Sequence, residues 1–175
     1  ENLKVSRFRN GELIPHITNQ NEWINAGVSG VLAYCAYDNN VALAQIYGYL
    51  FNWHAVNDSR GLCPAGWHVA TDSEWEEMTL SLSGASVAGG KLKEAGTLHW
   101  KSPNTAADNS SGFTALPSGF RGVNFSSIGE QGSFWTATRW DDETAFGRGV
   151  LHFSTGVSKS PHGLVFGRAV RCVKN

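Results

Sequence analysis

Three kinds of side chain in this sequence could carry chemistry: cysteine thiols, histidine imidazoles and a short run of carboxylates. Cys35 and His54 would make a nucleophile and its base if the fold joined them, but nothing in the sequence brings them together. A buried thiol and a solvent-facing imidazole are the simpler expectation. The chain also has no Gly-x-Ser-x-Gly motif of the kind that presents a hydrolase nucleophile. We therefore expect no catalytic centre.

Metal binding is indicated only weakly. Residues 141–143 are Asp-Asp-Glu, and oxygen ligands of this kind attract calcium, although adjacent acids on a loop are more often solvated. The histidines His99, His152 and His162 lack the spacing of zinc ligands, and no Cys-x-x-Cys pair is present. The sequence predicts no cofactor and no metal, with calcium at the acidic run as the alternative.

The cysteines number three: Cys35, Cys63 and Cys172. In an exported protein, one disulfide with one leftover thiol is the simplest arrangement. In a cytosolic protein, three reduced thiols in the core are the alternative. The count alone does not say which two would pair.

The composition describes a loop-rich globular chain. Its 175 residues suit one domain, and a hydrophobic content of 41% is enough for a packed core. Charged residues make up only 17%, and the 20 glycines predict many turns. A net charge of −1 lacks the electrostatic signature of nucleic-acid binding. No run of 18 apolar residues is present, so we expect no transmembrane segment and a single domain over residues 1–175.

Two short helices are predicted from their caps. Thr18 can cap a helix that Gly27 would end. Thr71 and Glu74 form a capping box, and apolar residues at helical spacing follow as far as Gly84. Strands are predicted at 44–56, 132–140, 146–154 and 164–175 from their β-prone residues. This pattern indicates an α+β domain with a modest antiparallel sheet and long loops.

The third of these strands has an alternating pattern that predicts two different faces. The face toward the core would carry Gly147, Gly149, Leu151 and Phe153. The exposed contact face would carry Phe146, Arg148, Val150 and His152.

Residues 88–122 form a long stretch without apolar periodicity. Large apolar side chains nevertheless occur throughout it, at Trp100, Phe113, Leu116 and Phe120. Disordered segments are poor in aromatic residues, so we expect an ordered loop held by these side chains rather than a linker.

Several motifs in fixed order, "YGYLFNWHAVNDSRGLCPAGWHVATDSEWEEM", "GGKLKEAGTLHW", "SGFTALPSGFRG" and "VRCVKN", resemble the Fibrobacter succinogenes major paralogous domain family. The resemblance covers nearly the whole chain. It implies a C-type-lectin-like fold, related to that of formylglycine-generating enzymes, with long ordered loops. It also implies a bacterial or phage surface protein.

The resemblance implies further features. A disulfide would join Cys63 to Cys172, with Cys35 unpaired, as expected outside the cell. One departure from the family pattern is Arg168, where an apolar residue is usual, and this makes burial of position 168 an open question.

Some proteins of this fold are diversified by retroelements in the region that matches residues 135–168. Aromatic and arginine residues dominate binding interfaces, and this region is rich in such types. The candidate ligand-binding residues are Trp140, Asp141, Phe146, Arg148, His152, Lys159 and His162. We expect a non-catalytic module that recognises a surface protein or glycan. The alternatives are a structural or adhesive domain of a surface lipoprotein and an enzyme related to formylglycine-generating enzymes.

Overall fold

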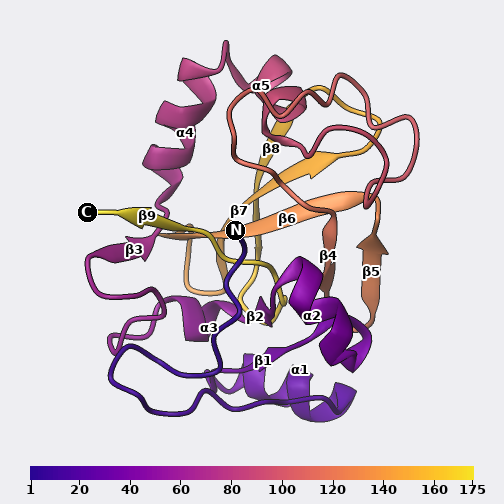
Figure 1. The fold of residues 1–175 in the computed structure, drawn as a ribbon. Coiled ribbons are helices and arrows are strands. Elements are labelled where there is room, and N and C mark those ends of the chain that lie inside the picture. Colours follow the sequence, from indigo (N-terminus) through magenta and orange to yellow (C-terminus); the bar gives the residue numbers. More distant parts are fainter.

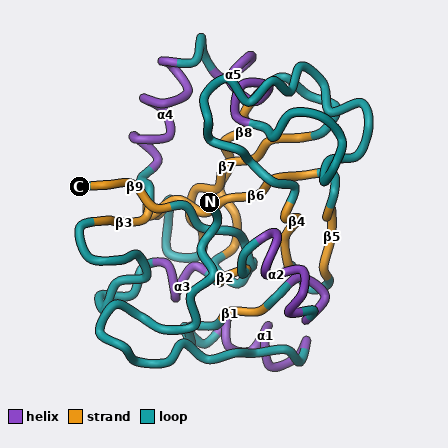
Figure 2. The backbone as a smooth tube through the Cα atoms, in the orientation of Figure 1, coloured by secondary structure: helices purple, strands orange, loops and turns teal.

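The computed structural model describes all 175 residues and shows an α+β fold, as predicted. Short helices surround small antiparallel sheets, and long loops join them (Figures 1 and 2). The helices are α1 (Gln20–Val28), α2 (Val41–Tyr47), α3 (Trp53–Val56), α4 (Asp72–Ser81) and α5 (Ala85–Leu92), with a 3₁₀ turn at Tyr37–Asn39. The strands are β1 (Tyr34–Cys35), β2 (Leu50–Phe51), β3 (Trp67–Val69), β4 (Ser118–Arg121), β5 (Phe125–Ile128), β6 (Gln131–Arg139), β7 (Thr144–Leu151), β8 (Val157–Gly163) and β9 (Cys172–Lys174).

The largest sheet has the strand order β6-β7-β8 and is antiparallel throughout. Strands β3 and β9 form a second pair, which joins the C-terminal end of the chain to the segment before α4. Helices α4 and α5 lie above the central sheet in Figure 1, whereas α1, α2 and α3 lie below it. Side chains therefore cover the central strand β7 from both sides.

The two faces of the central sheet belong to different hydrophobic clusters. Phe134 and Val150 pack with the side chains of α4 and α5. Trp135 and Ala145 pack on the opposite face with side chains of β2 and α3. Both faces are therefore covered over β6 and β7, whereas the edge strand β8 exposes Ser158, Lys159 and Pro161.

This arrangement contradicts the predicted alternation along residues 146–153. Phe153, expected in the core, is 62% exposed, whereas Val150 and Arg148 on the expected contact face are 1% and 2% exposed. The glycines Gly147 and Gly149 do face the opposite side and are buried. Parity separates the two faces of a strand, but it does not say which face is covered.

Helix α4 begins as predicted. Thr71 and Glu74 make both hydrogen bonds of the capping box, and the helix ends at Ser81. Gly84 does not end α4. It caps the start of α5 instead, with a φ of 91° that favours glycine.

The predicted ends of the first helix are wrong. The N-cap of α1 is Asn19, whose side chain accepts bonds from two backbone N–H groups, rather than Thr18. Gly27 lies inside the helix and does not end it. A Cβ atom at this position would collide with Val165, so Gly27 lets the two segments approach closely.

The strand predicted over residues 44–56 is also wrong. The segment contains the end of α2, the two residues of β2, and α3. Asn40 and Asn52 cap the two helices with their side chains, and Gly48 ends α2 with a φ of 78°. Local caps outweigh β propensity here because each one satisfies backbone N–H groups. The C-terminal strand is likewise shorter than predicted, covering only β9.

The long loop between α5 and β4 packs its large apolar side chains against the rest of the protein. Trp100 is 2% exposed and donates its indole N–H to the carbonyl of Ala115 at 3.0 Å. Phe113 packs edge-on against Trp75 and Phe134, and Phe113, Leu116 and Phe120 are all half-buried. Beneath the loop, Lys93 donates to three backbone carbonyls at 2.8–3.0 Å: those of Thr105, Leu151 and Ser154.

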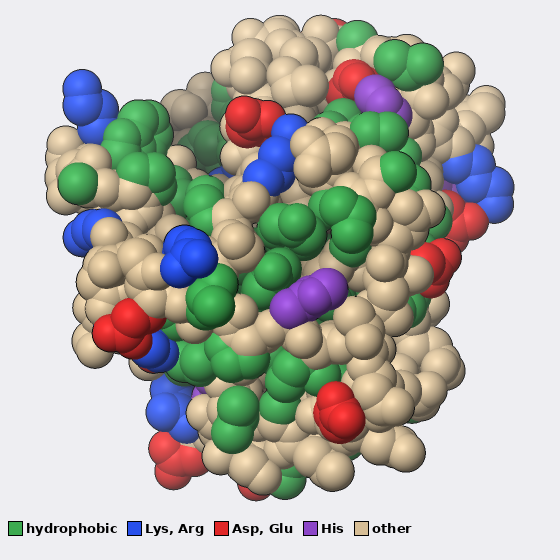
Figure 3. Space-filling model, turned by 60° about the horizontal axis from the view of Figure 1, so that its bottom comes forward, with side chains coloured by type: hydrophobic (Ala, Val, Ile, Leu, Met, Phe, Trp, Pro, Cys, Tyr) green, Lys and Arg blue, Asp and Glu red, His purple; other side chains and the backbone are tan.

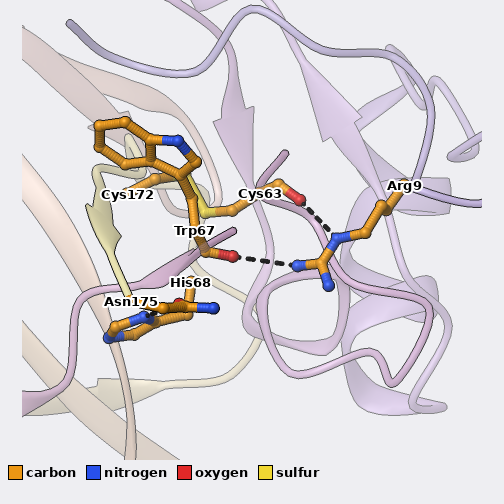
Figure 4. Close-up of a disulfide and its surroundings, with 6 residues drawn as sticks. All are labelled: Arg9, Cys63, Trp67, His68, Cys172 and Asn175. Atoms are coloured by element: carbon orange, nitrogen blue, oxygen red, sulfur yellow. Dashed lines mark hydrogen bonds between the residues drawn. A yellow bond between two sulfur atoms is a disulfide. The ribbon is translucent and has the colours of Figure 1, made fainter. Parts of the chain in front are cut away.

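The disulfide between Cys63 and Cys172 is present, as the resemblance implied, and its Cα atoms lie 6.0 Å apart. Figure 4 shows Arg9 beside it, donating to the carbonyls of Cys63 and Trp67 at 3.0 Å. Cys35 is free and buried. The covalent bond and the β3–β9 pairing thus connect the same two segments.

None of the helices has the length and apolar composition that crossing a membrane requires. Hydrophobic side chains gather over the middle of the face seen in Figure 3, around a histidine.

Candidate functional site

The candidate site lies at the hairpin between β6 and β7 and on the adjoining strand β8. Trp140 follows β6 and is 60% exposed. Its ring lies edge-on to Phe146, with ring centroids 5.0 Å apart. On β8, Lys159 places its Nζ 4.7 Å from the centre of the Phe146 ring. We call Trp140, Phe146 and Lys159 the hairpin patch.

A carboxylate of α4 holds the hairpin patch in place. Asp72 begins the helix, and its Oδ2 lies 2.6 Å from Nζ of Lys159. Its backbone N–H is bonded to the Thr138 side chain on β6 at 3.0 Å. Glu76, one turn further along α4, lies on the same side. Lys159 is therefore held between an aromatic ring and the start of a helix.

Arg148 was expected on the exposed contact face, and this expectation is wrong. Its side chain is 2% exposed and lies beneath the hairpin patch. The guanidinium donates to Asp72 Oδ1 at 2.6 and 2.9 Å and to Glu76 at 3.1 Å. Burial of this cation is possible because α4 supplies a carboxylate at the same depth. Arg148 is thus a framework residue that links β7 to α4.

Asp141 is exposed but serves the turn of the hairpin. Its Oδ1 accepts bonds from the backbone N–H groups of Glu143 and Thr144 and from the Thr144 hydroxyl, at 2.8–2.9 Å. These bonds, first that of Glu143, lower the pKa of Asp141. No group of three or more His, Cys, Asp or Glu side chains is arranged to hold a metal ion. The acidic run therefore acts through Asp141 as a turn-forming element.

The two candidate histidines lie away from the hairpin patch. His162 points to the opposite face of the sheet, where it packs against Trp135 and Phe166. Burial, with a contribution from Arg168, lowers the pKa of His162 to about 4. His152 follows the far end of β7, with Nδ1 3.1 Å from the carbonyl of Ser102. Seven residues were thus predicted to form one binding surface, and three of them form the hairpin patch.

A cavity of about 630 Å³ lies on the other flank of the hairpin, between its charged side chains and the C-terminal end of α1. Arg139, Asp142 and Glu143 line it from the hairpin, and His54 from α3. We call this the hairpin cavity. Arg139 was not among the predicted site residues, although its charge and its position just before the acidic loop could have indicated it. Its guanidinium donates to the carbonyls of Asp141 and Asp142, so hydrogen bonds within the hairpin set its position.

Cys35 and His54 do not form the pair considered above. Nε2 of His54 donates to the carbonyl of Gly27 at 2.8 Å, and no hydrogen bond joins it to Cys35. Burial raises the pKa of the Cys35 thiol to about 11, so the thiol stays protonated at neutral pH. A buried, protonated thiol is a poor nucleophile.

Comparison with known proteins gives one match. A model of the Fibrobacter succinogenes major domain matches residues 1–174. No curated protein and no solved structure matches the chain. The match extends over all of the elements described above, including β9 and the disulfide.

Proposed function

The chain belongs to the Fibrobacter succinogenes major domain family, and we propose that it is a non-catalytic recognition module that binds a surface protein or glycan. Contact is made by the hairpin patch and the adjoining hairpin cavity. The hairpin patch lies within residues 135–168, whereas the hairpin cavity is also lined by the end of α1 and by His54.

The observation that carries this proposal is the exposure of Trp140. A tryptophan that is 60% exposed and lies edge-on to Phe146 offers large apolar area to a partner. Tryptophan is among the residues that most often dominate binding energy at interfaces. Aromatic side chains with polar groups beside them also suit a sugar ring or a protein surface.

The rigidity of the patch supports the same function. Asp72 orients Lys159, and Asp141 closes the turn that presents Trp140. A side chain already held in one position loses less conformational entropy on binding. The charges beside the rings then select partners and raise the association rate more than they raise affinity.

Display outside the cell is part of the proposal. The disulfide between Cys63 and Cys172 is typical of oxidising compartments. A C-type-lectin-like fold, in which long loops rest on a small core, fits the packed α5–β4 loop and the bond that ties the last strand to the segment before α4. Diversification of residues 135–168 by a retroelement is proposed with it, and the coding DNA and its neighbourhood test this directly.

The test of recognition compares two exposed aromatic residues at opposite ends of β7. The labelled chain is applied to an array of defined glycans and to intact bacterial cells before and after surface proteolysis. We expect Trp140→Ala to weaken the signal by about tenfold or more, since a hot-spot residue contributes at least that much. Phe153→Ala, which removes a side chain that is 62% exposed, should leave binding unchanged.

Equal loss in both variants, or no loss in either, would contradict the assignment of the hairpin patch. Absence of any wild-type signal on both probes would favour the alternative of a structural or adhesive surface domain.

A further inference from the structure

A second cavity lies on the other side of α4 from the hairpin patch. It has a volume of about 420 Å³ and opens between α4 and β9, next to the start of the chain. Figure 1 shows these two elements on the same edge of the molecule, with the N-terminus nearby. We call it the α4–β9 cavity. Its size falls in the range of small-ligand sites.

The floor of the α4–β9 cavity is apolar and aromatic. Trp75 and Met78 line it from α4, Val173 from β9 and Phe113 from the long loop. The Trp75 and Phe113 rings meet edge-on, with centroids 5.4 Å apart. Such a floor suits the methylene stem of a long side chain.

One polar group of Trp75 is left without a partner. Nε1 of Trp75 is buried and has no hydrogen-bond acceptor in the protein. Trp53, Trp100, Trp135 and Trp23, by contrast, all donate to backbone carbonyls. A buried indole N–H without an acceptor is unfavourable, and this distinguishes Trp75 from the other buried tryptophans.

The charges around the α4–β9 cavity are predominantly negative. Glu1, Glu74 and Glu77 line it, and Glu77 makes no hydrogen bond or ion pair within the protein. Arg171 supplies the cationic side chain of the wall. Its three nitrogens already donate to Asn2 and to the carbonyls of the loop at 2.6–3.0 Å, so it belongs to the framework.

We propose that the α4–β9 cavity receives a lysine or arginine side chain from a peptide segment of a partner protein. The stem of the side chain lies on Trp75 and Phe113, and its cationic end meets the carboxylate of Glu77. Aromatic rings beside carboxylates are a favourable environment for a cation. This site is separate from the hairpin patch and does not depend on the function proposed for that patch.

The test uses the indole N–H resonance of Trp75 in the full chain, identified by its loss in Trp75→Phe. Three capped probes are titrated: N-acetyl-arginine methylamide, N-acetyl-lysine methylamide and N-acetyl-norleucine methylamide. We expect the two cationic probes to shift this resonance and to bind more tightly than the norleucine probe. In Glu77→Gln, binding of the cationic probes should weaken by about two- to fivefold, the effect of one exposed ion pair.

Glu22→Gln is the matched control, because it removes the same charge from an exposed position on α1, away from both sites. It should leave the titration unchanged. Equal binding of the norleucine probe, an unchanged affinity in Glu77→Gln, or no shift of the Trp75 resonance with any probe would overturn the proposal. The resonance of Trp140 serves as the separate reporter of the hairpin patch, so failure at one site is distinguishable from failure at the other.

Discussion

Arg148 and Arg168 are buried on opposite faces of the central sheet, and their surroundings differ. On the face toward α4, Arg148 is 2% exposed and is bonded to the carboxylates of Asp72 and Glu76. On the opposite face, Arg168 is 3% exposed and has no carboxylate partner. Its side chain donates one hydrogen bond, to Ser133, while its Nε has no acceptor.

Aromatic rings take the place of the missing carboxylate at Arg168. The guanidinium lies 5.3 Å from the centre of the Trp135 ring and 5.7 Å from that of Phe120. Burial lowers the pKa of Arg168 to about 9. The two arginines are equally buried but contribute differently to stability. Arg148 joins a strand to a helix through an ion pair, whereas the desolvation cost of burying Arg168 is not offset by a carboxylate.

The largest expected effect comes from Arg148→Met. Removing this cation leaves Asp72 buried with Lys159 as its only remaining cation, and breaking a buried pair costs about 3–5 kcal/mol. We expect the free energy of unfolding, measured by urea denaturation, to fall by about 3 kcal/mol. A loss below about 1 kcal/mol would show that the ion pair does not hold β7 to α4.

The second effect concerns Lys93, a buried cation whose partners are carbonyls rather than carboxylates. Burial lowers the pKa of Lys93 from 10.5 to about 8. The folded chain thus releases this proton near pH 8, whereas the unfolded chain keeps it until about pH 10.5. The free energy of unfolding must therefore rise between about pH 8 and pH 10.5, by at most about 3 kcal/mol.

The measurement is the difference in unfolding free energy between the wild type and Lys93→Met from pH 7.5 to 10.5. Lys91→Met, two residues away at a more exposed position, controls for general alkaline effects. A difference that falls with pH would mean that the three carbonyls hold the ammonium more strongly than burial opposes it.

The third effect should be small or of opposite sign. In Arg168→Met, an apolar side chain of similar length replaces a buried charge that has no counter-ion. We expect the unfolding free energy to stay within about 1 kcal/mol of the wild type or to increase. A loss as large as that of Arg148→Met would show that the aromatic rings and Ser133 stabilise Arg168 as well as carboxylates stabilise Arg148.

The smallest effect is on the titration of His162. Its pKa is lowered to about 4, chiefly by burial and secondarily by Arg168. Neutral His162 makes its full contribution to the free energy of unfolding above about pH 6.5. This contribution is lost as the pH falls toward 4, because the unfolded chain takes up the proton at a higher pH than the folded chain. In Arg168→Met, NMR titration should show a pKa that rises only part of the way to 6.5. An unchanged pKa would leave burial as the whole cause.

Local chemistry in the sequence predicted several elements correctly. The capping box of Thr71 and Glu74 defines the start of α4 because both partners lie within one helical turn. Strands β6 and β7 were predicted from residues that favour extended backbone, and the aromatic residues of the long loop correctly indicated packing. The disulfide followed from family resemblance, since three cysteines alone allow more than one pairing.

The errors had two causes: local helix caps that the prediction left out, and neighbours distant in sequence. Asn40 and Asn52 capped helices in a segment whose β-prone residues predicted a strand. Gly27 stayed inside α1 because Val165 packs against it. Of the candidate site, Trp140, Phe146 and Lys159 came together as expected, whereas His152 and His162 did not.

The sequence by itself determined the elements whose bonds close within a few residues, and the types of side chain that gather near the hairpin. Only the tertiary structure decided which of those side chains are exposed. By its residue type Arg148 resembles a binding residue. In the fold, however, α4 brings Asp72 to it from 76 positions away and buries the pair. Burial depends on what covers a strand, and the cover comes from elements whose positions no local pattern specifies.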